Sequence, residues 1–216
     1  IGHQASLIHP TVVYLDTELI LGNGVDVAPF CCLQGYIAIG DRTRIWPHVI
    51  IGTDGEHMTA KPSGLIVIGS DVQIREFSIV HRGTGDRDTA IGDRCFIMRN
   101  AHIAHDCVLA EEVTLSPNVT LGGHTRVHQG ATLGIGSMTH QHSTVGAYSM
   151  SGMGSVITRD VPPFALVMGN PARFVRWNTK AIEAHGIIGP LEDSDMYMAA
   201  MAEFKSDSRR KALETP

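Results

Sequence analysis

The sequence lacks the features of a membrane-inserted or exported protein. No apolar run approaches the roughly 20 residues that a membrane-spanning helix needs. The chain also does not begin with a basic segment, an apolar stretch and a small-residue cleavage site, which together mark a secretory leader. We therefore expect a cytoplasmic protein that does not insert into a membrane.

Cysteine, aromatic residues and positive charge are also scarce. The four cysteines are Cys31, Cys32, Cys95 and Cys107, and no two of them form a Cys-x-x-Cys pair of the kind that binds zinc or exchanges disulfides. Aromatic residues make up 6% of the chain and the formal net charge is -5, and both values disfavour a nucleic-acid partner. We expect reduced thiols that are mostly buried as small apolar side chains.

A six-residue repeat fills most of the chain. From Ile91 to Pro162 the sequence divides into twelve hexads, most of which open on an aliphatic residue, and seven more run from Leu15 to Glu56. Examples are IGDRCF, LAEEVT and LGGHTR. One large apolar residue in every six does not fit an amphipathic helix, which needs apolar residues three and four apart. The period instead predicts short strands separated by corners.

Such a repeat is typical of a parallel β-helix. Three hexads make one triangular coil, so residues eighteen apart stack, and neighbouring coils lie about 4.8 Å apart, as paired strands do. The stacked coils bury continuous columns of Leu, Ile and Val. Residues 52–66 and 82–89 carry charge, Gly and Pro without hexad order, which predicts loops that leave the coil.

The repeat stops near Pro162 and Pro163, and the remainder of the chain has a different character. Helices are expected near Thr179–His185 and from about Ser194 to Leu213, where Met, Ala, Lys and Glu are frequent. We therefore divide the chain into two parts, a β-helix domain over residues 1–163 and a C-terminal helical extension over residues 164–216.

Several strings give the sequence a specific resemblance. They are IREFSIVHRGT (74–84), FIMRNAHIAHDC (96–107), LGGH (121–124), THQ (139–141), DVPP (160–163) and GN (169–170). In this order they resemble the bacterial UDP-N-acetylglucosamine acyltransferases, hexapeptide-repeat enzymes of lipid A synthesis. The resemblance implies an all-β fold, a left-handed parallel β-helix with a small α-helical cap, assembled as a homotrimer with three shared active sites.

The resemblance also implies a reaction and the residues that perform it. The family moves a hydroxyacyl chain from acyl carrier protein to a sugar 3-hydroxyl, which needs a base for the hydroxyl proton and a donor for the thioester oxyanion. His105 matches the family's general base, Asp106 the acid that orients it, and the Gly123 backbone N–H the oxyanion donor. The repeat adds support, because Gly123 follows His105 by eighteen residues and so lies one coil along the same edge.

Further residues match family positions that contact substrate, several of them in the cleft between neighbouring subunits. Met153 lies where the family has its acyl-length ruler, and a methionine in place of glycine predicts a shorter acyl chain, of about ten carbons or fewer. The substrate-binding set is His81, His102, His124, His140, Gln141 and Asn178.

The nucleotide-reading segment departs from the family pattern. Of an Asn, a Glu and two Arg, only Asn178 is retained, and the others align with Lys180, Ala184 and His185. The acceptor sugar therefore stays open between UDP-N-acetylglucosamine and a related nucleotide amino sugar, for example one with an amine at position 3.

Other functions on the same scaffold remain as alternatives. One is sugar O- or N-acetyl transfer from acetyl-coenzyme A, which the GNPAR ending (169–173) permits. Another is a zinc hydratase like the γ-class carbonic anhydrases, which the three-residue spacing of His102 and His105 disfavours. A non-catalytic scaffold is disfavoured by the complete set of His, Asp and Gly. We expect no resident metal and no cofactor beyond the acyl carrier protein thioester.

Overall fold

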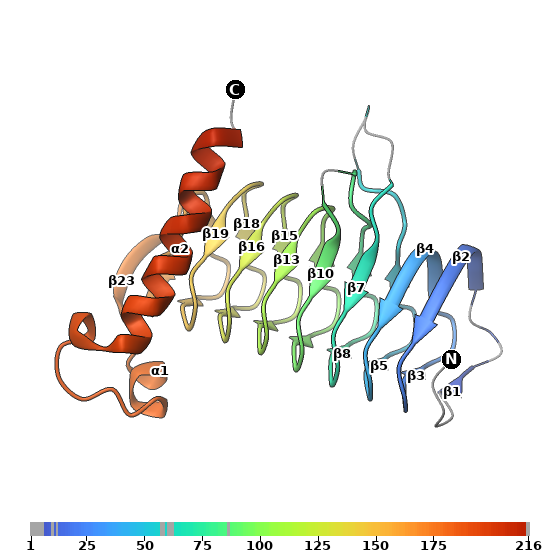
Figure 1. Ribbon diagram of the computed structural model, residues 1–216, viewed down its shortest axis with the longest axis horizontal. Coiled ribbons are helices and arrows are strands. Elements are labelled where there is room, and N and C mark those ends of the chain that lie inside the picture. The colour runs from blue at the N-terminus through green and yellow to red at the C-terminus, as the bar shows by residue number, and fades with distance from the viewer. Residues whose placement is uncertain are drawn as a thin grey trace.

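The coil is a prism of short parallel strands with helices at its C-terminal end (Figure 1). The computed structural model describes residues 7–214 except 10, 12, 57–58, 60–62 and 86, with side chains at 9, 11 and 18–207 outside the same gaps. The prism is left-handed. The predicted fold class, an all-β left-handed parallel β-helix with a small α-helical cap, is confirmed.

The strands form three faces. Face one contains β1 (Leu7–Ile8), β3 (Asp26–Val27), β5 (Arg44–Ile45), β8 (Gln73–Ile74), β11 (Phe96–Ile97), β14 (Thr114–Leu115), β17 (Thr132–Leu133), β20 (Met150–Ser151) and β22 (Ala165–Met168). Face two contains β2 (Val13–Leu21), β7 (Ile66–Ile68), β10 (Thr89–Ile91), β13 (Val108–Leu109), β16 (Arg126–Val127) and β19 (Thr144–Val145). Face three contains β6 (Ile50–Ile51), β9 (Ile79–Val80), β12 (His102–Ile103), β15 (Thr120–Leu121), β18 (Met138–Thr139) and β21 (Val156–Ile157). The strand β4 (Cys32–Ile39) joins faces two and three, because its two ends pair with β6 and β7.

The stacking register is eighteen residues, as predicted. Phe96 pairs with Thr114, and Thr114 pairs with Thr132. The two predicted loops account for the longer coils, since Ile50 pairs with Ile79 and Ile79 with His102, spacings of 29 and 23 residues. Both loops leave between face three and face two, so they emerge at the same edge of the prism.

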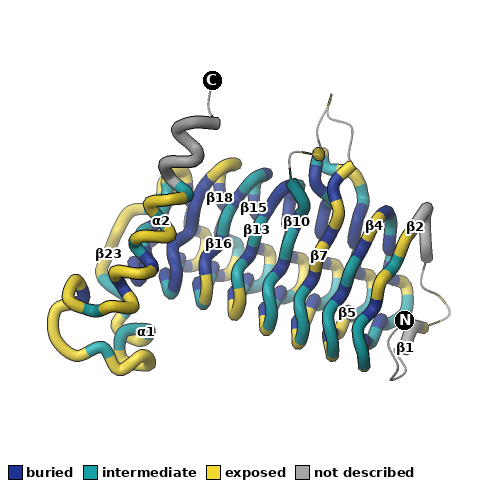
Figure 2. Tube along the Cα trace, viewed as in Figure 1, coloured by how far each residue is buried: buried dark blue, intermediate teal, exposed yellow. Residues whose placement is uncertain are grey.

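The core contains two inward positions in each hexad rather than the single one expected. Besides the aliphatic residue, the residue two places before it is also buried, and dark blue buried positions alternate with teal and yellow ones along the coils (Figure 2). These second positions hold small side chains, among them Cys95, Cys107 and Thr125. Burial raises the pKa of the Cys107 thiol to about 12, and all four cysteines are free, so the expectation of reduced, mostly buried thiols is confirmed.

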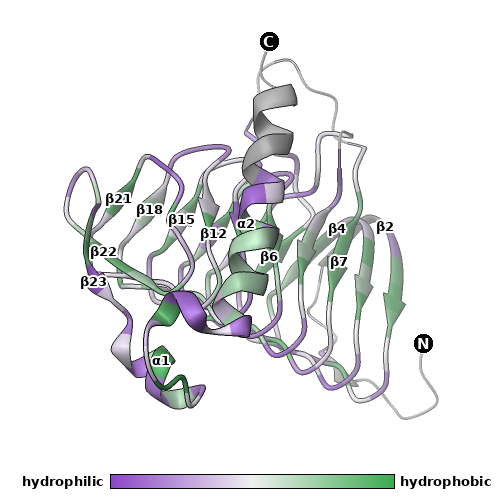
Figure 3. Cartoon of the chain, turned by 60° about the vertical axis from the view of Figure 1, so that its left-hand side comes forward, coloured by the Kyte–Doolittle hydropathy of each residue, from purple (hydrophilic) through white to green (hydrophobic). Residues whose placement is uncertain are grey.

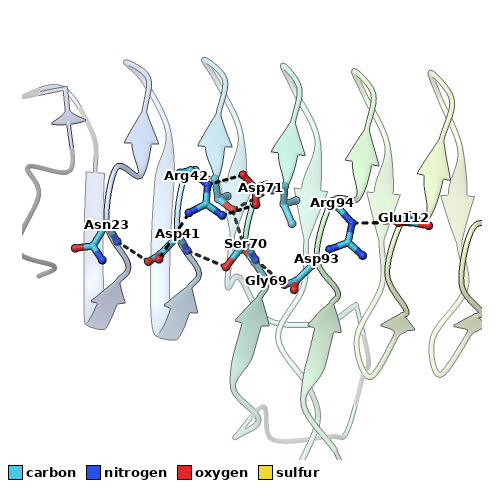
Figure 4. A network of polar contacts seen from close by, with 11 residues as sticks. Asn23, Asp41, Arg42, Gly69, Ser70, Asp71, Asp93, Arg94 and Glu112 are labelled. Carbon is cyan, nitrogen blue, oxygen red and sulfur yellow. Dashed lines mark hydrogen bonds and ion pairs between the residues drawn. The ribbon is translucent and has the colours of Figure 1, made fainter.

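The corners are built from residues in the left-handed backbone conformation. Asn100, Asp106 and Glu112, each six residues after the last, have φ of 58°, 59° and 60°. Such angles are uncommon outside glycine, and polar contacts between coils accompany them. On the edge between faces two and one, Arg42 donates two hydrogen bonds to Asp71 at 2.7 and 2.6 Å, and Arg94 pairs with Glu112 on the following coils (Figure 4).

The C-terminal part caps the last coils. The coil path continues past Pro163 through β22, and β23 (Arg173–Trp177) pairs antiparallel with it, a strand that the sequence reading did not anticipate. The helices α1 (Thr179–Ala184) and α2 (Asp195–Glu214) confirm the two predicted helices, and a 3-10 turn, η1 (Leu191–Asp193), lies between them (Figure 3). None of the helices described is long and apolar enough to cross a bilayer.

The helix α2 is fastened to face two by charged groups. Arg126 on β16 pairs with Asp207 of α2, and His128 lies 3.2 Å from Glu203 and 3.1 Å from Asp207. A separate apolar cluster of Phe164, Leu191 and Tyr197 joins the base of the helical part to the last coil. The cap is therefore held both by packing and by paired charges.

Candidate active site

The histidine and aspartate singled out in the sequence form a hydrogen-bonded pair at one edge. His105 and Asp106 occupy the corner after β12, on the edge between faces three and two, here called the site edge. The Nδ1 atom of His105 lies 2.6 Å from Oδ2 of Asp106. Because a carboxylate only accepts hydrogen bonds, Nδ1 carries the proton in this pair, and the ring's second nitrogen, Nε2, is the one with a lone pair that can act as a base.

Asp106 is fully buried but well supplied with hydrogen bonds. The Thr84 backbone N–H and hydroxyl donate to its carboxylate at 3.1 and 2.8 Å, and the Asp106 N–H donates to the Thr89 hydroxyl at 2.9 Å. Burial alone would raise the pKa of this carboxyl, but the hydrogen bonds from His105 and Thr84 outweigh it and hold the pKa below its ordinary value. Asp106 is therefore ionised at neutral pH and fixes the orientation of the His105 ring.

Two glycines enclose the His105 ring. A Cβ atom on Gly123 would lie 2.7 Å from Cε1 and 2.8 Å from Nε2 of His105, and a Cβ on Gly55 would lie 2.8 Å from the His105 Cβ and 2.9 Å from Cδ2. Both distances are shorter than any real contact, so the ring fits only because both positions lack a side chain. Within the described residues the Gly123 N–H donates no hydrogen bond, so it remains available beside Nε2. The predicted one-coil spacing of His105 and Gly123 thus brings them into contact.

An open cavity of about 390 Å³ lies over this corner. His81 and His102 face each other across part of it, with ring centroids 4.9 Å apart in an edge-on arrangement. Burial lowers the pKa of both rings below the ordinary histidine value, and the nearby Glu56 carboxylate only partly opposes that shift. Both imidazoles are therefore neutral at pH 7 and can accept or donate hydrogen bonds to a polar ligand.

The structure gathers most of the predicted site residues and separates the rest. Those lining the cavity are His81, His102, His105, Gly123, His140 and Gln141. His124 lies behind it, with Nε2 3.7 Å from Asp106 Oδ2 and its ring stacked on His142 at 4.4 Å. Burial lowers the pKa of His124 more than the Asp106 charge raises it.

The two other predicted residues lie elsewhere. Asn178 is the N-terminal cap of α1, where its side chain accepts from the Ala181 N–H and donates to the Tyr148 carbonyl at 2.8 Å. Met153 is 77% exposed, on the far edge of face three from His105. Two further exposed apolar residues lie nearby. Met138 is on face three between the two edges, and Ile135 is one coil before Met153 on the same edge.

The structure also assigns to the site Gly55 and Thr84, which the sequence analysis did not single out. Gly55 and Glu56 come from the first loop, where Arg82 donates to Asp54 at 2.8 Å and to the Thr53 carbonyl at 3.1 Å. Thr84 lies inside the HRGT string (81–84), so this motif could have identified it as a site residue. Gly55 lies in a loop without hexad order, so no sequence period relates it to its neighbours in space. These loops therefore build one wall of the site.

The same corner contains a group of metal-ligating atoms. One ligand atom each from His105, Asp106 and His124 lies within 4.8 Å of the other two. The sequence reading expected no resident metal, and that prediction stands untested.

The chain is similar to known acyltransferases. The bacterial transferase hexapeptide family (six repeats) matches residues 88–123. The acyl-(acyl-carrier-protein)-UDP-N-acetylglucosamine O-acyltransferase of Campylobacter concisus is 35% identical over 177 residues, 80% of this chain and 66% of that protein. The enzyme of the same name from Synechocystis sp. is 33% identical over 186 residues, 84% of this chain and 67% of that protein. The solved UDP-N-acetylglucosamine acyltransferase from Campylobacter jejuni matches with a TM-score of 0.73 and 27% identity, over 97% of this chain and 91% of that chain. The chain thus spans about two thirds of the length of these curated relatives.

Proposed function

This chain belongs to the acyl-(acyl-carrier-protein)-UDP-N-acetylglucosamine O-acyltransferase family, and we propose that it moves a hydroxyacyl chain from acyl carrier protein to the 3-position of UDP-N-acetylglucosamine or a related nucleotide amino sugar. The observation that carries this proposal is the arrangement at the site edge. His105 is oriented by a buried carboxylate and packs closely against Gly123, whose N–H donates no hydrogen bond to any part of the chain that the structure describes. A base and an oxyanion donor are the two groups that acyl transfer from a thioester requires.

The geometry supports a direct transfer. Nε2 of His105 takes the proton of the acceptor hydroxyl while that oxygen attacks the thioester carbonyl. The Gly123 N–H donates to the oxyanion that forms, and Asp106 stabilises the imidazolium through Nδ1. The tetrahedral intermediate then collapses, the C–S bond breaks, and the imidazolium gives its proton to the departing thiolate. In this scheme the chain needs no metal and no cofactor beyond the acyl carrier protein thioester.

The acceptor and donor are expected to meet in the cavity of the site edge. His81 and His102, both neutral, together with His140 and Gln141 offer hydrogen bonds to the sugar hydroxyls. The acyl chain would run across face three over Met138 toward Met153, whose exposed side chain would end the groove and select a chain of about ten carbons or fewer. Asn178 would need to release its capping contacts before it could read a nucleotide.

A homotrimer in the cytoplasm, acting in lipid A synthesis, is the assembly and setting that we propose. An exposed apolar group on face two, comprising Ile20, Tyr36, Leu65 and Val67, supports burial against another subunit. Sedimentation or light scattering should give a mass near three times 23.3 kDa. A stable monomer at working concentration would contradict the trimer.

A donor competition tests the reaction itself. The protein is offered a hydroxyacyl-acyl carrier protein and acetyl-coenzyme A, each with UDP-N-acetylglucosamine or its 3-amino analogue, and the products are resolved by mass. We expect turnover with the acyl carrier protein donor, at least about 100-fold reduced in His105→Ala because the base is gone. Turnover with acetyl-coenzyme A alone would replace this proposal with the acetyltransferase alternative, which the relatives do not favour.

A further inference from the structure

The pair at the site edge has a third partner, His124, to which the proposed proton-transfer and oxyanion steps assign no role. His124 occupies the corner one coil beyond Asp106, and its ring stands edge-on to His105 at 90° with centroids 5.1 Å apart. Its Nε2 points at the same carboxylate oxygen that His105 contacts through Nδ1. Two imidazole nitrogens and one carboxylate oxygen therefore converge on one point from two neighbouring coils.

We infer that His105, Asp106 and His124 bind a divalent transition-metal ion such as Zn²⁺, and that the bound ion inactivates His105 as a base. The second half of this inference rests on the proposed function, whereas the first half does not.

The spacing of the three ligand atoms suits a metal ion after small movements. In a tetrahedral zinc site with bonds of about 2.0–2.1 Å the ligand atoms lie about 3.4 Å apart. Here Oδ2 of Asp106 is 2.6 Å from Nδ1 of His105 and 3.7 Å from Nε2 of His124, and all three atoms fall within 4.8 Å. Two histidines with one carboxylate form a common catalytic-type ligand set, which leaves an open position for water.

The chemistry of the three groups also favours an ion of this class. Asp106 is fully buried and accepts hydrogen bonds from His105 and Thr84, so the cluster offers one carboxylate oxygen and two imidazole nitrogens to an ion. Hard cations such as Mg²⁺ and Ca²⁺ require a shell of oxygen ligands and should bind poorly here. Imidazole suits zinc, copper, nickel and cobalt.

Metal binding would change which nitrogen of His105 carries the proton. In the free pair, Nδ1 holds the proton and donates it to Asp106, leaving Nε2 as the base. A metal bond to Nδ1 moves that proton to Nε2, so no net proton is released and the face toward Gly123 carries N–H instead of a lone pair. Such a ring cannot accept the acceptor proton, and the ion acts as a reversible inhibitor.

Direct binding measurements test the site without any turnover. Chelator-treated protein is titrated with Zn²⁺ by calorimetry and with Co²⁺ by visible absorption, which reports nitrogen and oxygen coordination. We expect one ion per chain and at least a 10-fold weaker affinity in His124→Asn. Asparagine suits the left-handed backbone of this corner, where φ is 59°. The matched control is His48→Asn, at a left-handed corner on another edge of the prism with φ of 62°, which should keep the wild-type affinity.

The outcomes separate this inference from the proposed function. Equal affinities in wild type, His124→Asn and His48→Asn, with folding verified by thermal melts, would overturn the metal site, as would binding below about 0.1 ion per chain. If the site binds metal and acyl transfer is observed, stoichiometric Zn²⁺ should abolish transfer and excess chelator should restore it. Full activity of the zinc-loaded protein would overturn the inhibitory role while leaving the acyltransferase proposal intact.

Discussion

Replacing Gly123 with alanine should disable the site without disturbing the fold. The added methyl would lie 2.7 Å from Cε1 and 2.8 Å from Nε2 of His105, whereas ordinary contacts begin at 3.4 Å. The ring must therefore move by about 0.6 Å or more. Gly55 also lies close to this side chain, since a Cβ atom there would be 2.9 Å from Cδ2, so we expect the ring to shift toward the open cavity and away from its observed position.

The expected loss follows from the sensitivity of acid-base catalysis to position. A misplacement of about 1 Å can reduce the rate by about 100-fold, which corresponds to about 2.7 kcal/mol of activation free energy. The backbone should tolerate the change, since Gly123 is outside the left-handed region that neighbouring corner residues occupy. We therefore expect kcat/KM to fall by about 100-fold while the melting temperature changes little.

The assay compares initial rates of acyl transfer for wild type, Gly123→Ala and Gln129→Ala. Gln129 is exposed and occupies the same place in its hexad as Gly123, but on another edge, so its truncation should leave the rate unchanged. Wild-type activity in Gly123→Ala would refute the argument that the glycine is needed to seat the His105 ring. Equal losses in Gly123→Ala and Gln129→Ala would show that a substitution at this hexad position lowers the rate whether or not it contacts His105.

Three further predictions concern other parts of the site. Thr84→Val removes the hydroxyl donor to Asp106 while keeping the N–H, so urea titration should show a loss of about 1–3 kcal/mol of unfolding free energy, and an unchanged midpoint would contradict this role. Met153→Gly should shift donor preference toward longer acyl chains in a competition assay; the same preference as wild type would exclude Met153 as the ruler. Because burial lowers the pKa of His81 and His102, the unfolded chain binds protons more readily, so their contribution to stability is complete above the ordinary value of 6.5 and is lost as pH falls below it. Denaturation between pH 7.5 and about 5 should show this slope, and His102→Asn should reduce it; a slope identical to wild type would refute the assignment.

The repeat explains why much of the site could be predicted from the sequence. A period of six with three hexads per coil fixes which residues share an edge, and that register alone placed Gly123 beside His105. The neighbouring pair of His105 and Asp106 followed from the same corner. Local periodicity therefore predicted the fold and the shared edge of His105 and Gly123, whereas the roles of base, orienting acid and oxyanion donor are implied by the resemblance to the acyltransferase family.

The remaining contacts could not be predicted because they depend on segments without a period. Gly55 reaches His105 from a loop whose length breaks the eighteen-residue spacing, and nothing in the sequence relates the two positions. Asn178 matched a motif but is occupied as a helix cap, which only the packing of α1 reveals. The attachment of α2 through Arg126 and His128 likewise depends on tertiary contacts between distant segments.

Both loops leave the prism at the edge that holds His105, and the strands on either side of them resume the same stacking. The two loops thus supply one wall of the site, whereas His105, Asp106 and Gly123 come from corners of the coil itself. Replacing either loop with one of another length should leave the β-helix folded while it changes the shape of the wall around His105. Acceptor preference in this fold can therefore change through replacement of loops at a single edge, while the stacked coils that keep the chain folded stay the same.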